Sequence, residues 1–289
     1  MAVDSGTPAG TVAGPVQFAV DDAELNLAGA RRRRFSWQRL TYGLLGLALA
    51  ATVWQLVSYA KNDPVILPTV QETARTFWHY LFVKYPAVGG RTLWQHALTS
   101  AQRILAGWAV GVLIGIVLGG IMASAKVVRF ILDPLIEVTR PLPPLAFIPL
   151  FIVWFGIGET PKFILILIGV IPIMIIATVS ALDSVPPELV QASRSLGASA
   201  LWSLVTVRLR SALPPIITGM RLAMGGAWTS IVAVELIAAT SGLGYVINNA
   251  GVNLQTPLVL SGILSISVLG IVFDSLLRLL RRIADPTVR

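Results

Sequence analysis

Three charged side chains lie inside long apolar runs of the sequence: Arg103, Arg221 and Glu235. A charge at membrane depth is costly, so such residues are candidates for a polar pathway. The functional interpretation of the two arginines is electrostatic guidance of an anion. The structural alternatives are pairing or lipid contact for Arg103, pairing with a polar loop or reach to the membrane surface for Arg221, and local capping or pairing of a partly exposed Glu235.

Other residue types that carry chemistry are sparse. The chain has no cysteine, and His79 and His96 have no other metal-type ligand nearby in sequence, so we expect no metal site. Both histidines fall outside the expected spans, which argues against a serine–histidine enzyme at membrane depth. The chain has no G-x-x-x-x-G-K-[ST] motif, and the glycine spacing of G-I-G-E-T-P-K at 156–162 is wrong for one. We therefore predict no enzyme and no cofactor bound by this chain; an ATP-driven process would need a separate ATPase.

The elements that must position the three charges are membrane helices. Hydrophobic residues make up 55% of the chain and charged residues 12%, and the mean hydropathy is +0.77. An ordinary soluble domain has about 25% charged residues. The apolar runs are continuous rather than alternating, which favours helices over a transmembrane barrel. We predict an all-α polytopic membrane protein with about six spans, at 40–60, 97–124, 143–157, 162–182, 212–237 and 256–277.

Arginine and lysine are distributed unevenly over the predicted loops. Fifteen lie on the side of the two termini and five on the other side. By the positive-inside rule, both termini and the loop after the fourth span are cytoplasmic. We expect residues 1–38 to be a disordered, basic cytoplasmic tail, in which the Arg31 to Arg34 run meets anionic lipid rather than nucleic acid. The membrane domain follows over 39–285.

Glycines and prolines mark unusual helix packing. Four glycines spaced by four residues lie along the second span: Gly107, Gly111, Gly115 and Gly119. This stripe predicts close contact with another helix, within the chain or at a subunit interface. The prolines of 141–149 predict that the third span is kinked or joined to the preceding segment. They mark either an ordinary helix start or broken backbone beside a translocation path, with Arg140 and Pro144 at its border.

A polar segment at 188–221 interrupts the apolar sequence. Residues 188–196 are good helix formers, Gly197 permits a left-handed turn, and 198–211 form a second helical piece with Trp202 on one side. A rigid helix–turn–helix at this place predicts a docking element. A partner that pushes on it would move the fourth and fifth spans together.

The same segment carries a family resemblance. Q-A-S-x-x-x-G at 191–197 and A-L-P at 212–214 resemble the EAA loop of bacterial binding-protein-dependent ABC importer permeases. Three further stretches resemble the nitrate/taurine/alkanesulfonate branch, and taurine-type permeases most: L-D-P-L-I-E-V-T-R-P-L-P-P-L-A-F-I-P-L at 132–150, W-F-G-I-G-E-T-P-K at 154–162 and V-E-L-I-A-A-T-S-G-L-G at 234–244. The resemblance covers about 40–285. It implies the type I importer permease (MetI-like) fold in a bacterial inner membrane.

The resemblance also implies a role for the polar segment. Residues 188–211 are then the coupling loop that docks in a groove of the ATPase, through Glu188, Gln191, Ala192, Ser193, Arg194, Gly197, Ala198 and Trp202. The implied assembly holds two such chains, two ATPase subunits that bind ATP and magnesium, and an extracytoplasmic solute-binding protein. The chain departs from the family at Gln191, where Glu is usual, at Ser193, where Ala is frequent, and at 207–210, where I-x-L-P is frequent.

The sequence therefore predicts the permease subunit of an ATP-driven importer of a small anion. Taurine or an alkanesulfonate is the first choice, while nitrate, aromatic carboxylates and heterocyclic vitamin precursors remain open. Pairing with a related chain instead of a second copy also remains open. The alternative is a secondary transporter that works alone. That class often has internal repeats, and none is found in this sequence.

Overall fold

The computed structural model describes residues 37–85 and 89–284, and this part of the chain is helical, without strands. It divides into two compact units, one ending at Val53 and one beginning at Trp54. Helix α2 (Trp37–Lys61) runs through both. The predicted tail over 1–38 lies outside the described residues, apart from the first two residues of α2.

Five described helices are long and apolar enough to cross a membrane. They are the Thr41–Lys61 stretch of α2, α4 (Leu93–Ser124), α7 (Glu159–Asp183), α11 (Leu213–Ala238) and α13 (Thr256–Ala284). About 20 helical residues span the roughly 30 Å hydrocarbon core. The predicted all-α membrane fold is confirmed.

The third expected span has a different form from the other five. Helix α5 (Lys126–Thr139) and a second piece, a 3-10 turn (Pro144–Phe147) that leads into α6 (Ile148–Phe155), meet at a bend of 86°. The prolines at 141, 143 and 144 remove backbone donors at this bend. Eight helical residues extend only about 12 Å, so α6 cannot cross alone. A sixth crossing therefore has to combine α5 with α6.

The glycine stripe packs α4 against α7. A Cβ atom at Gly107, Gly111, Gly115 or Gly119 would overlap one side chain of α7, in the order Ile166, Val170, Met174, Thr178. The partner positions are also four residues apart, so two stripes face each other along the whole contact. The prediction of close packing within the chain is confirmed for these four glycines.

Helix α11 approaches the other side of α7 in the same way. A Cβ atom at Gly226 would lie 2.7 Å from the carbonyl oxygen of Gly169, and one at Gly219 would overlap Ala177. Gly225 has open space around it within the chain. Helix α7 is therefore the central element of the second unit, with α4 and α11 on its two flanks.

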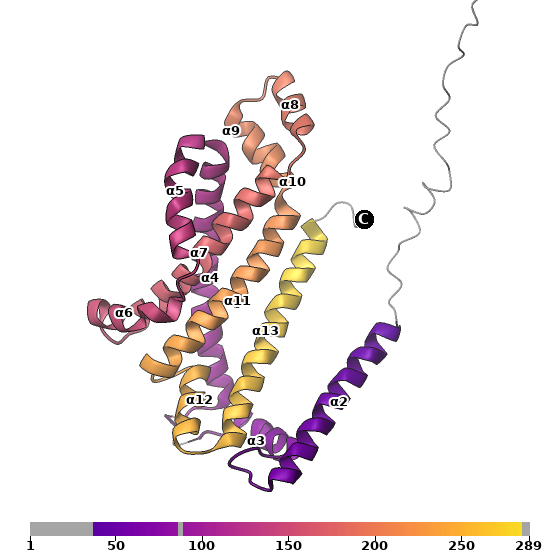
Figure 1. Cartoon of the computed structure of the whole chain (residues 1–289), viewed down its shortest axis with the longest axis vertical. Coiled ribbons are helices and arrows are strands. Elements are labelled where there is room, and N and C mark those ends of the chain that lie inside the picture. Colours follow the sequence, from indigo (N-terminus) through magenta and orange to yellow (C-terminus); the bar gives the residue numbers. More distant parts are fainter. Residues whose placement is uncertain (1–36, 86–88, 285–289) are drawn as a thin grey trace, which may run out of the picture. The chain divides into compact units, whose positions relative to one another are not determined.

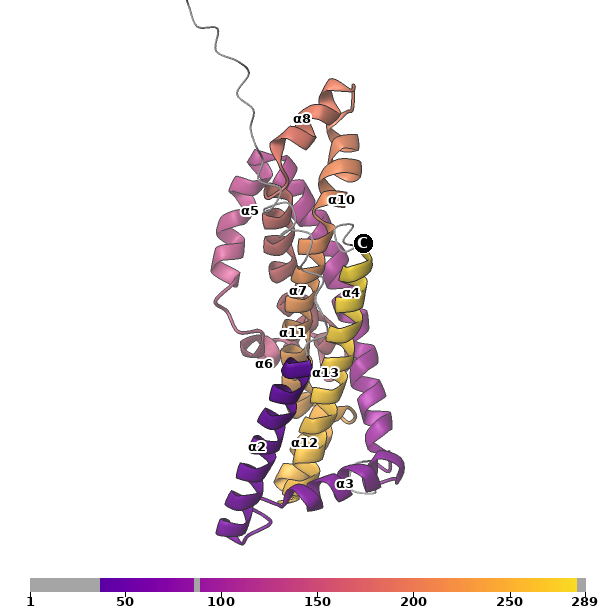
Figure 2. The same ribbon diagram turned by 90° about the vertical axis from the view of Figure 1, so that its right-hand side faces the viewer.

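Short elements gather at the two ends of this bundle (Figures 1 and 2). At one end, α8 (Pro187–Ser195) and a second arm form a hairpin; the second arm runs through α9 (Ala200–Trp202), a π-helical segment (Ser203–Arg208) and α10 (Leu209–Ser211). At the other end lie α3 (Val70–Phe82) and α12 (Leu243–Val252). We call these the hairpin end and the α12 end.

Candidate functional site

The turn of the hairpin has the geometry expected from its glycine. Gly197 has φ +82°, its N–H donates to the Arg194 carbonyl, and the Ala198 N–H donates to the Ser193 carbonyl at 3.1 Å. These two bonds form a Schellman motif, which ends α8 and satisfies its last carbonyls. Space around Gly197 is open, so the backbone conformation rather than crowding requires glycine here.

Serine hydroxyls hold the two arms together. The buried Ser193 donates to the Val190 carbonyl, and its oxygen lies 2.7 Å from Ser203 Oγ on the second arm. Either hydroxyl can be the donor in this bond. Ser199 caps the second arm by accepting from the Trp202 N–H. The hairpin is thus internally fixed, and Ser193 faces its interior.

The other predicted coupling residues lie on the outside of the hairpin. Glu188, Gln191, Ala192, Arg194, Gly197 and Trp202 are exposed, and Ala198 is half-buried. Two exposed leucines that flank the turn, Leu196 and Leu201, were not among the predicted coupling residues. Leu196 is 89% exposed, next to the glycine. Apolar residues inside a polar segment are the signal that could have found them.

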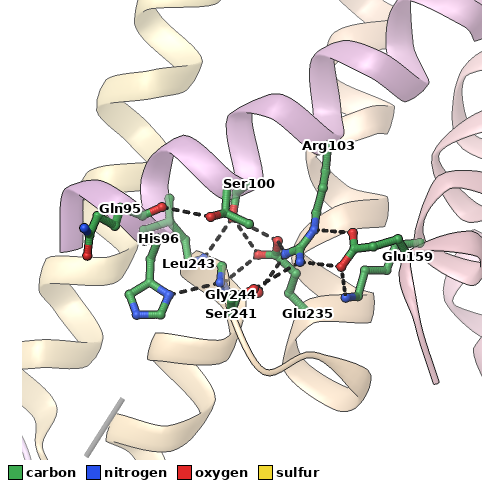
Figure 3. Close-up of polar contacts among 12 residues, drawn as sticks. Gln95, His96, Ser100, Arg103, Glu159, Glu235, Ser241, Leu243 and Gly244 are labelled. Carbon is green, nitrogen blue, oxygen red and sulfur yellow. Dashed lines mark hydrogen bonds and ion pairs between the residues drawn. The ribbon is translucent and has the colours of Figure 1, made fainter. Parts of the chain in front are cut away.

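Glu235 lies at the α12 end, and the expectation of a partly exposed carboxylate is wrong. Its relative exposure is 1%. Figure 3 shows its partners: Ser100 donates to both carboxylate oxygens, Arg103 Nη1 donates to Oε1 at 2.8 Å, and the Gly244 N–H donates to Oε2. Ser100 in turn accepts from the Leu243 N–H. The carboxylate therefore joins α4, α11 and the first turn of α12, where the helix dipole favours a negative charge.

Arg103 forms the centre of this ionic cluster. Its Nε and Nη2 bind both oxygens of Glu159 at 2.6 Å, and its remaining N–H groups reach Glu235 and both the carbonyl and the hydroxyl of Ser241. A guanidinium has five N–H donors, and these five bonds use all of them. Lys162 donates a third hydrogen bond to Glu159. This arrangement favours structural pairing of Arg103 over guidance of an anion.

Two glycines allow the backbone to approach Glu235. A Cβ atom at Gly242, where φ is +119°, would overlap the Glu235 carboxylate, and one at Gly244 would lie 2.6 Å from Glu235 Cβ. The Gly242 N–H donates to Nδ1 of the buried His96. The backbone of S-G-L-G at 241–244 thus packs closely around the carboxylate of Glu235.

Sequence reasoning missed several members of this cluster. His96 was expected outside the spans, but α4 begins at Leu93, with Thr92 and Gln95 forming a capping box. Glu159 and Lys162 belong to the G-I-G-E-T-P-K stretch, which was interpreted as a wrongly spaced nucleotide motif and as part of the family resemblance, not as a source of ion pairs. Charged residues at the start of an apolar helix were the available signal.

The remaining pathway candidates lie apart from this cluster. Arg221 in α11 binds Asp274 of α13 at 2.7 Å, and Asp274 also pairs with Arg278 one turn along α13. Arg221 therefore pairs with a helix rather than with the hairpin loop. Arg140 is exposed at the end of α5, and Pro144 is half-buried at the start of the 3-10 turn.

Comparisons with known proteins identify the family. The family model of the binding-protein-dependent transport system inner membrane component matches residues 111–284, which include α7, the hairpin and α11. The chain belongs to this family. It is the permease subunit of an ABC importer, a class that works with ATPase subunits and binding proteins.

Similar permeases cover more than four fifths of the chain. It is 38% identical to the taurine transport system permease protein TauC of Escherichia coli, over 89% of this chain and 94% of the relative. It is 33% identical to the putative aliphatic sulfonates transport permease protein SsuC of Bacillus subtilis, over 87% and 88%. The nitrate import permease protein NrtB of Synechococcus elongatus is 28% identical, over 84% and 89%.

A solved structure supports the fold. A chain of the inward-facing MetNI methionine ABC transporter superposes with a TM-score of 0.61, covering 67% of this permease and 96% of that chain. Its sequence identity is 18%. The predicted MetI-like fold is confirmed.

Proposed function

We propose that this permease moves a small anion into the cytoplasm when an ATPase subunit acts on the hairpin. The solute proposed first is taurine or another alkanesulfonate, since the relatives include a taurine permease and sulfonate permeases. Nitrate and aromatic carboxylates come next, and a nitrate permease is also among the relatives. We take the hairpin end and both termini to be cytoplasmic, because most lysines and arginines lie on that side.

The proposed assembly holds two copies of this chain, two ATPase subunits that bind ATP and magnesium, and an extracytoplasmic solute-binding protein. This chain then binds no cofactor and catalyses no reaction itself. The membrane is a bacterial inner membrane, with the bundle in contact with lipid.

The observation that carries the proposal is the rigid, partly apolar tip of the hairpin. A Schellman turn and the Ser193–Ser203 bond fix the two arms, while Leu196, Leu201 and Trp202 are exposed beside charged residues. Exposed apolar groups rimmed by polar ones are typical of a protein interface. A rigid docking element transmits force, whereas a flexible loop absorbs it.

Leu196→Asp tests the docking surface. Because it places a charge in the apolar contact, we expect the amount of ATPase subunit that co-purifies with the permease to fall about tenfold, which corresponds to about 1.4 kcal/mol. Val252→Asp is the matched control, since Val252 is 78% exposed at the α12 end, and it should leave co-purification unchanged. Equal retention of the ATPase by both variants would contradict docking at the hairpin.

The solute is tested with the whole complex in proteoliposomes. Taurine uptake that needs ATP and the binding protein supports the proposal, and calorimetry of the binding protein with taurine, nitrate and benzoate separates the solute classes. Uptake by the permease with no ATPase present would instead support a secondary transporter.

A further inference from the structure

Arg208, on the second arm of the hairpin, reaches the ends of two membrane helices. Its Nη2 donates to the Leu182 carbonyl at 3.2 Å and its Nη1 to the Ala123 carbonyl at 3.5 Å. Leu182 lies in the last turn of α7 and Ala123 in the last turn of α4. Carbonyls in the last turn lack i+4 helix partners and carry the negative end of the helix dipole, and the Leu182 carbonyl also accepts from the Val185 N–H at 3.4 Å. A guanidinium is therefore well matched to both positions.

A chain of ion pairs extends from the same residue. Arg208 Nη2 lies 3.9 Å from Asp183 Oδ1, and Arg129 of α5 donates to Asp183 Oδ2 at 2.8 Å. Arg129 also pairs with Asp133, one turn along α5, at 3.6 Å. The side chains of Arg208, Asp183 and Arg129 thus connect the hairpin with α7 and α5.

Arg208 provides a link that the backbone does not. The hairpin continues α7 at one arm and leads into α11 at the other, so the chain itself already joins it to these helices. Helix α4 ends far earlier in the sequence. Among the described hydrogen bonds and ion pairs, the bond from Arg208 to the Ala123 carbonyl joins the hairpin to α4.

The π-helical segment sets the direction of Arg208. The segment Ser203–Arg208 is wound with i→i+5 bonds and ends at this residue. One extra residue in a helix turns all later side chains by about 100°. The register that points Arg208 toward α4 and α7 therefore depends on this local winding. π-helical turns occur frequently at functional positions.

We propose that Arg208 is a positioning residue that carries displacement of the hairpin, and of the α7 end joined to it, to the end of α4. This inference rests on the proposed docking of the ATPase at the hairpin. When the hairpin moves, the guanidinium group of Arg208, which binds the Leu182 and Ala123 carbonyls, moves the end of α4 together with that of α7. Because α4 and α7 are packed through the glycine stripe, they then shift as one body.

Hydrogen–deuterium exchange on the full complex tests this inference without knowledge of the solute. The complex of permease and ATPase is compared free and trapped with ATP and vanadate. In the unchanged protein we expect trapping to alter exchange in α8–α10 and also in the last turns of α4 and α7. In Arg208→Ala the changes in α8–α10 and in the last turn of α7, which the backbone joins to α8, should remain, while the change in the last turn of α4 falls about tenfold.

Two matched variants accompany Arg208→Ala. Arg210 is exposed and has no hydrogen bond or ion pair among the described contacts. Arg210→Ala therefore removes the same charge and should leave the exchange change at the helix ends as in the unchanged protein. Arg208→Lys keeps the charge without the planar fork, and we expect it to recover only part of the response. If Arg208→Ala does not assemble, Arg208→Lys still provides the comparison with Arg210→Ala.

The possible results separate the inference from the proposed function. If trapping changes exchange in α8–α10 and the Arg208 variants still show the full change in the last turn of α4, the inference is wrong and docking stands. If trapping changes nothing in α8–α10 of the unchanged protein, docking at the hairpin is wrong and the inference falls with it. Loss of transmission in Arg210→Ala as well would show a general charge effect and would also overturn the role of Arg208.

Discussion

The two ends of the bundle use the same residue types in opposite ways. At the α12 end, Glu235 is buried and Arg103 has all its donors occupied. At the hairpin end, the paired side chains of Arg129 and Asp183 are 41% and 42% exposed. Loss of one partner of a buried ion pair strongly destabilises a protein, whereas an exposed ion pair contributes little to its stability. The α12 end is thus fixed, and the hairpin end can exchange partners.

This difference suits a protein that is driven from one side. An input that arrives at the hairpin needs contacts that rearrange at small energetic cost, such as exposed ion pairs and helix-end carbonyls. The helices that receive it need a fixed point at the far end, or the motion would be lost in local distortion. The hydrogen bonds of the buried Glu235 carboxylate provide such a fixed point for α4, α11 and α12.

Removal of one carboxylate at each end should give the largest contrast. Glu235→Ala leaves the Arg103 charge and the Gly244 N–H without their partner, and we expect a loss of about 3 kcal/mol in stability, typical of a broken buried pair. Asp183→Ala should lose less than about 1 kcal/mol. Denaturant titration of the purified permease in detergent measures both. Equal losses of stability in the two variants would contradict the difference between the α12 end and the hairpin end.

The glycine stripe is the physical connection between the ends, and a neighbouring pair of glycines tests it. A Cβ atom at Gly119 would lie 2.7 Å from Thr178 Cβ, while Gly120 has open space. Gly119→Ala should therefore destabilise by about 1–3 kcal/mol through overpacking. Gly120→Ala, on the same helix turn, should change stability by less than about 0.5 kcal/mol. If the two variants behave alike under the same titration, close packing of α4 on α7 does not join the ends.

The sequence predicted features that depend on periodicity or on one residue's backbone. The spacing of four between glycines predicted the close helix contact of α4, and Gly197 predicted the turn with positive φ. Both signals are local in the sequence. Helix lengths followed from continuous apolar runs. The bend near residue 140 was anticipated from its prolines, although the eight-residue length of α6 was not.

Features that depend on tertiary register could not be predicted. Arg103 and Glu235 are 132 residues apart in the chain, and only the helix packing brings them together. Glu159 was hidden because its glycine-rich neighbourhood suggested a different motif. The direction of Arg208 depends on the π-helical segment, for which the sequence offers no periodic signal. Charged residues near apolar helix ends were visible, but their partners were not.

The smallest expected effect concerns the exposed ion pair itself. A double-mutant cycle with Arg129→Ala and Asp183→Ala should give a coupling of about 0.2–1 kcal/mol at low salt. The coupling should fall by about half at 1 M salt, because the Debye length falls from about 10 Å at 0.1 M to about 3 Å, close to the 2.8 Å between Arg129 Nη1 and Asp183 Oδ2. A cycle with Arg103→Ala and Glu235→Ala should keep most of its coupling, since water and ions are excluded from that pair. A salt-insensitive Arg129–Asp183 coupling would mean that the hairpin end is as fixed as the α12 end, and a rearrangement driven through it would then need another hinge.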